Sequence, residues 1–160
     1  AERLGLSASE QATAERVAAL CKSDLATQLV VEITSLQGIM GRVYAERGGE
    51  APEVARAIEQ HYWPRAMGDK LPESRAAVVV SLADRLDSLM GLFAVGIRPT
   101  GAADPWGLRC AALGLVQLLT GGELDLDLGE TLAVAARACR ASRTATRRIG
   151  DCGRRRHHAA

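Results

Sequence analysis

The chain has 160 residues, enough for one domain with a packed core, and 48% of them are apolar, which argues against intrinsic disorder. Aromatic residues make up only 3%, whereas Ala, Leu and Val are abundant, and this composition favours closely packed helices over a sheet. No apolar run approaches the roughly 20 residues that cross a bilayer, and the first residues show no export signal, so we expect a soluble protein without a membrane partner.

The net charge of +1 is unevenly distributed along the chain. Residues 1–136 hold 12 Lys and Arg against 18 Asp and Glu, a net charge of −6, whereas residues 137–160 hold eight Arg against one Asp, a net charge of +7. A basic end of this kind is typical either of a nucleic-acid-binding tail or of a solvated, disordered terminus, and we favour the second. We therefore predict a folded domain over residues 1–141 and a basic, disordered tail over residues 142–160.

Helix signals follow one another through the first half of the chain. The S-x-x-E spacing at residues 7–10 is that of a capping box, in which each end satisfies a free backbone N–H of the other. Apolar residues then recur at helical spacing, and Gly48 and Pro52 mark the end of one helix and the start of the next. The helices expected here begin near residues 7, 24, 36 and 52.

The strongest periodic signal covers residues 74–95. Apolar side chains recur there in steps of three and four, which places them on one stripe of a helix. We expect this stripe to form the centre of the core, and we expect Arg85, which lies off the stripe, to contribute little to stability. The stripe consists of Val78, Leu82, Leu86, Leu89 and Phe93.

The last third contains a loop and two more helices. Gly and Pro mark a loop over residues 96–101, and Asp104-Pro105 is a favourable helix start, with an acidic cap before a proline at the first helical position. Leu124, Leu126 and Leu128 alternate with acidic residues, the only strand-like pattern present. A final helix is expected over residues 131–141. The fold class predicted is all-α, a bundle of about six to seven helices.

Few residues are candidates for catalysis or metal binding. Four cysteines without a C-x-x-C pair are typical of free thiols in a reducing compartment, and a zinc site is not expected. His61 stands at a predicted helix end, where packing or capping is favoured over catalysis. Asp24, Asp84 and Asp87 could bind a divalent metal if they converged, but we favour surface acids or partners of Arg42 and Arg85.

Seven segments, in this order and with near-constant spacing, resemble beta subunits of bacterial-type glycyl-tRNA synthetases. The resemblance covers roughly residues 12–136. The segments are KSDLATQLVVE (22–32), LQGIMGRVYA (36–45), EQHYWPR (59–65), GDKLP (68–72), LADRLDSLMGLF (82–93), GIRPTG (96–101) and DPWGLRCAALG (104–114).

The resemblance implies an HD-like helical domain that helps to hold tRNA. In that family the alpha subunit, or the alpha part of a fused organellar enzyme, binds glycine and ATP. The implied partners are therefore the alpha subunit and tRNA(Gly), and ATP and Mg serve the whole enzyme, with no cofactor and no catalytic residue in this chain. The implied location is the cytoplasm of a bacterium, or a plastid or mitochondrion.

The chain also departs from the patterns that the resemblance implies. Ser23-Asp24 stands where a working HD hydrolase has a His-Asp doublet, so Asp24 and Asp84 would be remnants of a degenerate site that holds no metal. Trp106 and Arg109-Cys110 stand where the family usually has Phe and paired Arg. The likeness ends after residue 136, before the expected anticodon-binding domain, so we expect a fragment or truncated product.

The resemblance also directs attention to possible tRNA contacts. Arg98 and Arg109 could bind phosphates and Trp106 could stack on an unpaired base, with Arg42 as a further candidate. The alternative is that Trp106 belongs to the core and that Arg109 pairs with an acid such as Asp104. Two other functions remain open, a degenerate HD-type metal phosphohydrolase and a helical interaction domain unrelated to translation.

Overall fold

A computed structural model describes residues 4–100 and 104–140, and every regular element in these two ranges is helical. The expected all-α class with six to seven helices is therefore confirmed. The helices are α1 (Ala8–Leu20), α2 (Gln28–Glu32), α3 (Ile39–Arg47), α4 (Pro52–Gln60), α5 (Arg75–Ala94), α6 (Leu108–Gly121) and a further helix over residues 128–140, with short 3-10 turns at Ser23–Ala26 and Thr34–Leu36.

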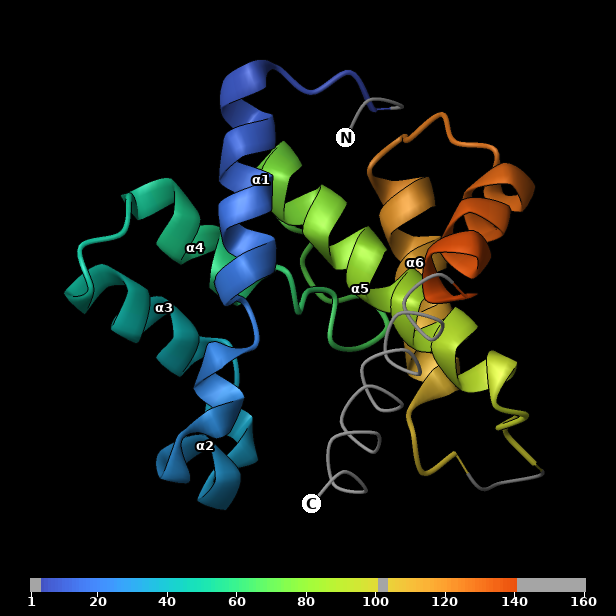
Figure 1. The fold of residues 1–160 in the computed structure, drawn as a ribbon, viewed down its shortest axis with the longest axis horizontal. Helices are drawn as coiled ribbons and strands as arrows, with labels where there is room; N and C mark the ends of the chain where they lie inside the picture. The colour runs from blue at the N-terminus through green and yellow to red at the C-terminus, as the bar shows by residue number, and fades with distance from the viewer. Residues whose placement is uncertain (1–3, 101–103, 141–160) are drawn as a thin grey trace, which may run out of the picture.

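Helix α5 runs through the middle of the molecule and joins two lobes (Figure 1). On one side of it lie α1, α3 and α4, and on the other lie α6 and the helix over residues 128–140, while α2 forms an outlying end. The expected capping box is present, because Ser7 and Glu10 bond each other's backbone N–H at the start of α1. At the start of α5, the Ser74 hydroxyl accepts a hydrogen bond from the backbone N–H of Ala77, without a reciprocal bond.

Each lobe has its own apolar cluster, and α5 supplies both. Its first turns place Ala76, Ala77 and Val80 among the small side chains of α1 and α4. Its later turns bury Leu82, Leu86 and Leu89 against Leu108, Leu115 and Leu118 of α6. Small residues in the first cluster allow α1, α4 and α5 to approach closely, which accounts for the high alanine content.

The predicted stripe of α5 is right for its three leucines and wrong at its end. Val78 is partly buried beside the second cluster, but Phe93 is 44% exposed. The reason is the spacing of the buried residues along the helix. After Leu89, the next residue on the buried face is Leu92, three positions later, and Leu92 packs against the second cluster together with Ile97. The aromatic ring one position further therefore faces outward.

Some expected elements differ from the observed ones. The helix expected near Asp24 is divided into a 3-10 turn and the five-residue α2. Helix α6 begins at Leu108, after Gly107 in the left-handed region (φ 65°), instead of directly after Asp104. The strand-like residues 124–127 are a connection without regular structure, and Asp127 then caps the last helix through the amide of Glu130.

None of the helices in the described ranges combines the length and apolarity that a membrane span requires. The predicted basic tail, residues 142–160, lies outside the described residues.

Candidate functional site

A cluster of polar side chains surrounds the ammonium group of Lys22, just after the end of α1. Its Nζ donates to Asp84 Oδ2 at 2.9 Å and lies 3.1 Å from His61 Nε2. It also lies 4.2 Å from the centroid of the Tyr62 ring. The cluster therefore joins the end of α1 to the end of α4 and to α5. Although burial opposes the charged form, the carboxylate of Asp84 raises the pKa of Lys22 above its ordinary value.

His61 is the most enclosed member of this Lys22 cluster, with 1% of its surface exposed. Its Nδ1 lies 2.5 Å from the carbonyl oxygen of Ile58, so the ring donates through Nδ1 and accepts at Nε2 from the Lys22 ammonium. Burial, followed by the nearby charge of Lys22, lowers the pKa of His61 to about 4. His61 is thus a neutral, packed residue at the C-cap of α4, in line with the expected packing role.

Asp24 is buried, contrary to the expectation that it lies at the surface. Its exposed fraction is 1%, and its Oδ2 accepts the backbone N–H groups of Gly38 and Gly41 at 2.7 and 3.2 Å. A Cβ atom at Gly41 would lie 2.8 Å from the side chain of Ile58 and 3.2 Å from this carboxylate. Gly41 therefore permits close approach of α3 and α4, and the backbone amides of Gly38 and Gly41 bind an internal carboxylate.

The acids considered as metal ligands have separate roles. Asp84 pairs with Lys22, whereas the favoured expectation made it a surface acid or a partner of Arg42 or Arg85. Arg42 instead pairs with Glu59 at 2.6 Å and with Glu46 at 2.9 Å. Within the described ranges, no three His, Cys, Asp or Glu side chains form a group that could hold a metal ion.

Arg85 is a structural residue that the sequence did not reveal. Its Nη2 donates to the carbonyl oxygens of Pro64 at 2.7 Å and Tyr62 at 3.3 Å, and Ser81, one turn earlier, donates to the carbonyl between them at 2.9 Å. Helix α5 thus satisfies three consecutive carbonyls of the α4–α5 connection. Arg85 was expected to contribute little to stability because it lies off the apolar stripe. That premise is wrong, because the side chain is half-buried and hydrogen-bonded. Gly114, which leaves room for the guanidinium, is the only sequence signal that could have indicated it.

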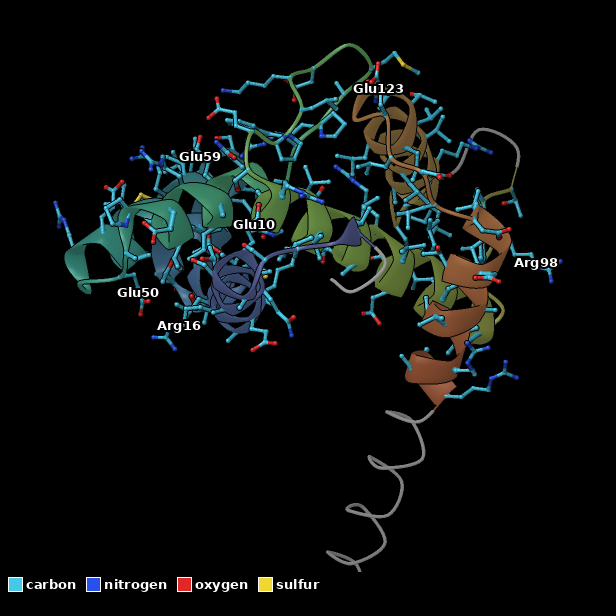
Figure 2. All side chains as sticks on the ribbon, turned by 90° about the horizontal axis from the view of Figure 1, so that it is seen from above. Glu10, Arg16, Glu50, Glu59, Arg98 and Glu123 are labelled. Atoms are coloured by element: carbon cyan, nitrogen blue, oxygen red, sulfur yellow. The ribbon has the colours of Figure 1, made fainter. Side chains whose placement is uncertain are left out.

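The loop between α5 and α6, together with the first turn of α6, carries three of the four residues considered for tRNA contact. Trp106 is 63% exposed, so the alternative that places it in the core is wrong. Arg98 and Arg109 are also exposed, and Arg98 extends outward at the end of the molecule remote from Arg16 and Glu50 (Figure 2).

The backbone around this loop is held by Asp104. Its carboxylate accepts the N–H groups of Leu108 and Arg109 at 2.9 and 2.7 Å, and thereby caps the first turn of α6. The end of α5 and the start of α6 lie at the same end of the lobe that contains α6 and the helix over residues 128–140 (Figure 1). Arg42, the fourth candidate, lies on α3 in the other lobe, and its charge is balanced by the two glutamates named above.

Comparison with known families identifies the chain. The sequence profile described as "Glycyl-tRNA synthetase beta subunit" matches residues 1–158. The chain belongs to this beta-subunit family. Among curated members, the glycine–tRNA ligase beta subunit of Halalkalibacterium halodurans is 52% identical over 132 residues, and that of Neisseria meningitidis is 50% identical over 126 residues.

The similarity covers most of this chain and a small part of those beta subunits. It spans 82% of the chain but 19% of the Halalkalibacterium protein, and 79% of the chain but 18% of the Neisseria protein. The chain therefore corresponds to about a fifth of the length of a beta subunit. The resemblance found in the seven sequence segments is confirmed at the level of the family.

Proposed function

We propose that the chain acts as part of a glycine–tRNA ligase, as a helical module of the beta subunit that supports tRNA binding while glycine is attached to tRNA(Gly) at the expense of ATP. The observation that carries this proposal is the 52% identity, over 82% of the chain, to a protein named as a glycine–tRNA ligase beta subunit. A relationship this close favours the synthetase over the two alternatives, a phosphohydrolase and an unrelated interaction domain.

In this proposal the catalytic reaction of the ligase takes place on another subunit. Glycine, ATP and the accompanying Mg would bind the alpha subunit, which is the second proposed partner besides tRNA. The described residues support that division, because both ring nitrogens of His61 are engaged and its low pKa suits packing better than proton transfer. The relatives named above favour a bacterial cytoplasm over an organelle as the place of action.

The tRNA-facing surface in this proposal is the α5–α6 loop with the first turn of α6. It combines two exposed arginines, Arg98 and Arg109, with the exposed indole of Trp106. Guanidinium groups bind phosphates through paired N–H donors, and an exposed indole stacks on an unpaired base. The capping of Leu108 and Arg109 by Asp104 fixes the backbone from which Arg109 extends. Arg42 is a weaker candidate, because Glu46 and Glu59 balance its charge.

The test uses a complete ligase of one of the relatives, in which the matching segment is replaced by residues 12–136 of this chain. Arg98→Ala with Arg109→Ala should raise the KM for tRNA and leave glycine-dependent ATP–pyrophosphate exchange intact, since the exchange needs no tRNA. Arg47→Ala with Arg56→Ala is the matched control, because both arginines are exposed on the other lobe. Unchanged tRNA kinetics in the first double variant would refute the proposed surface.

A further inference from the structure

The ammonium group of Lys22 lies where a bound cation would be expected. Three kinds of group that bind cations surround it: the Asp84 carboxylate at 2.9 Å, the unprotonated imidazole nitrogen of His61 at 3.1 Å and the face of Tyr62 at 4.2 Å. Carboxylate oxygen and neutral imidazole nitrogen are also common ligands of divalent transition metals. His61 and Tyr62 directly follow α4 and Asp84 lies on α5, whereas Lys22 directly follows the end of α1.

We propose that the Lys22 ammonium is the resident cation of a site built from an imidazole and a carboxylate, two ligand types that divalent transition metals also take, so that the side chain of Lys22 occupies the position that a metal ion would need. This inference concerns a site outside the proposed tRNA surface and does not depend on it.

The support around His61 resembles that of a metal-binding histidine. Such a histidine nearly always donates its other ring N–H to a carbonyl or carboxylate, which fixes the tautomer and the orientation of the ring. Here Nδ1 lies 2.5 Å from the Ile58 carbonyl oxygen, and Nε2 is directed at the cation. The Nε2 atom of His61 is therefore free of a proton and accepts a hydrogen bond, and the Lys22 ammonium donates that hydrogen bond.

Access from solvent is present on the other side of the cluster. A groove of about 460 Å³ lies between α1 and α5, and Cys21, Lys22, Asp84 and Asp87 are among its lining residues. The Lys22 side chain itself is 40% exposed. A metal ion could therefore reach the position of the ammonium without opening the core.

The natural chain does not fit a metal at this position. Among the residues that the structure describes, only two metal-ligand side chains, His61 and Asp84, meet there, and the positive charge of Lys22 would repel a second cation. Replacing Lys22 by histidine would remove the charge and add a third ligand. An imidazole followed by a metal–nitrogen bond of about 2.0–2.1 Å has nearly the reach of a lysine side chain, so the metal would take the place of Nζ.

The experiment measures Co²⁺ binding to the full chain by titration calorimetry and visible absorption, with helical circular dichroism as the check on folding. All samples carry His157→Ala, His158→Ala and Cys152→Ser, which remove metal-binding side chains of the tail. Lys22→His should bind one Co²⁺ per chain, about tenfold or more tighter than the Lys22 parent. Addition of Asp84→Asn should abolish the gain.

Lys70→His is the matched control. The ammonium of Lys70 also lies over an aromatic ring, 3.6 Å from the centroid of Trp63, and the residue is exposed. This control should bind no more Co²⁺ than the parent. The proposal is overturned if folded Lys22→His binds no better than Lys70→His, or if the parent already binds one Co²⁺ per chain.

If Lys22→His does not fold, a second measurement on the unaltered chain tests the proposal. Long-range ¹H–¹⁵N spectra of the unaltered chain at pH 7 report which ring nitrogen of His61 carries the proton. The proposal requires a neutral ring protonated at Nδ1, with Nε2 accepting from Lys22. The opposite tautomer, or an imidazolium, would contradict it.

Discussion

The guanidinium of Arg85 lies against Gly114, where an added Cβ atom would come within 2.7 Å of Arg85 Cζ. Because the same guanidinium is held by the carbonyl oxygens of Tyr62 and Pro64, it cannot withdraw without breaking these hydrogen bonds. The absence of a side chain at position 114 of α6 thus allows α5 to organise the connection that follows α4.

This contact predicts that Arg85→Ala and Gly114→Ala destabilise the fold by the same route. Loss of the arginine leaves two carbonyls without their donor, which costs about 1–3 kcal/mol, and overpacking at Gly114 should cost a similar amount. Urea denaturation measures both effects. Arg56→Ala, on the exposed face of α4, is the control and should change stability by less than about 0.5 kcal/mol. Equal effects of Arg85→Ala and Arg56→Ala would show that the carbonyl contacts contribute nothing.

The end of the α5 stripe provides a second test. Leu86→Ala should lower the free energy of unfolding by about 2–5 kcal/mol, because it opens a cavity between α5 and α6. Phe93→Ala removes a larger side chain from the same helix but should cost about 1 kcal/mol or less, since that ring is 44% exposed. Thermal denaturation of the two variants compares them directly. A larger loss for Phe93→Ala would mean that the buried face of α5 is wrongly assigned.

His61 predicts the acid sensitivity of the fold. Its pKa is lowered from 6.5 to about 4 in the folded chain, by burial and by Lys22, while the hydrogen bond to the Ile58 carbonyl and the charges of Asp84 and Asp24 act in the opposite direction. As the pH falls below 6.5 the unfolded chain binds a proton at this position, whereas the folded chain does not until about pH 4. Stability is therefore lost progressively across that window, by up to about 3 kcal/mol.

The measurement is the urea midpoint at pH 7.5 and pH 5.0 for the natural chain and for His61→Gln. The variant lacks the titrating group, so its midpoint should fall less over this interval, even if it is less stable at pH 7.5. The same pH dependence in both proteins would assign the acid sensitivity to other groups.

The sequence predicted those parts of the structure that depend on neighbouring residues in the chain. The capping box at Ser7–Glu10 and the periodicity of α5 identify helices, because each depends on residues within one or two turns. The end of the buried stripe was mispredicted because Leu92 and Phe93 both continue a helical pattern. Only the position of α6 decides between them.

The polar contacts were not predictable for a different reason. Lys22 meets His61 across 39 positions of sequence and Asp84 across 62, and nothing in the local pattern of Lys22 distinguishes it from a solvated lysine. Asp24 was likewise treated as a surface acid, since its partners are backbone amides 14 and 17 residues away. Pairings at such separations become visible only when the helices are placed.

The most direct test of the proposed role in tRNA binding is the salt dependence of tRNA affinity in the rebuilt complete ligase. If Arg98 and Arg109 each contact a phosphate, their joint replacement by alanine should weaken binding and reduce the slope of log K against log salt concentration by about 1 per arginine. The Arg47→Ala, Arg56→Ala enzyme should retain the slope of the parent. An unchanged slope and affinity in the Arg98→Ala, Arg109→Ala enzyme would contradict the claim that this surface holds tRNA.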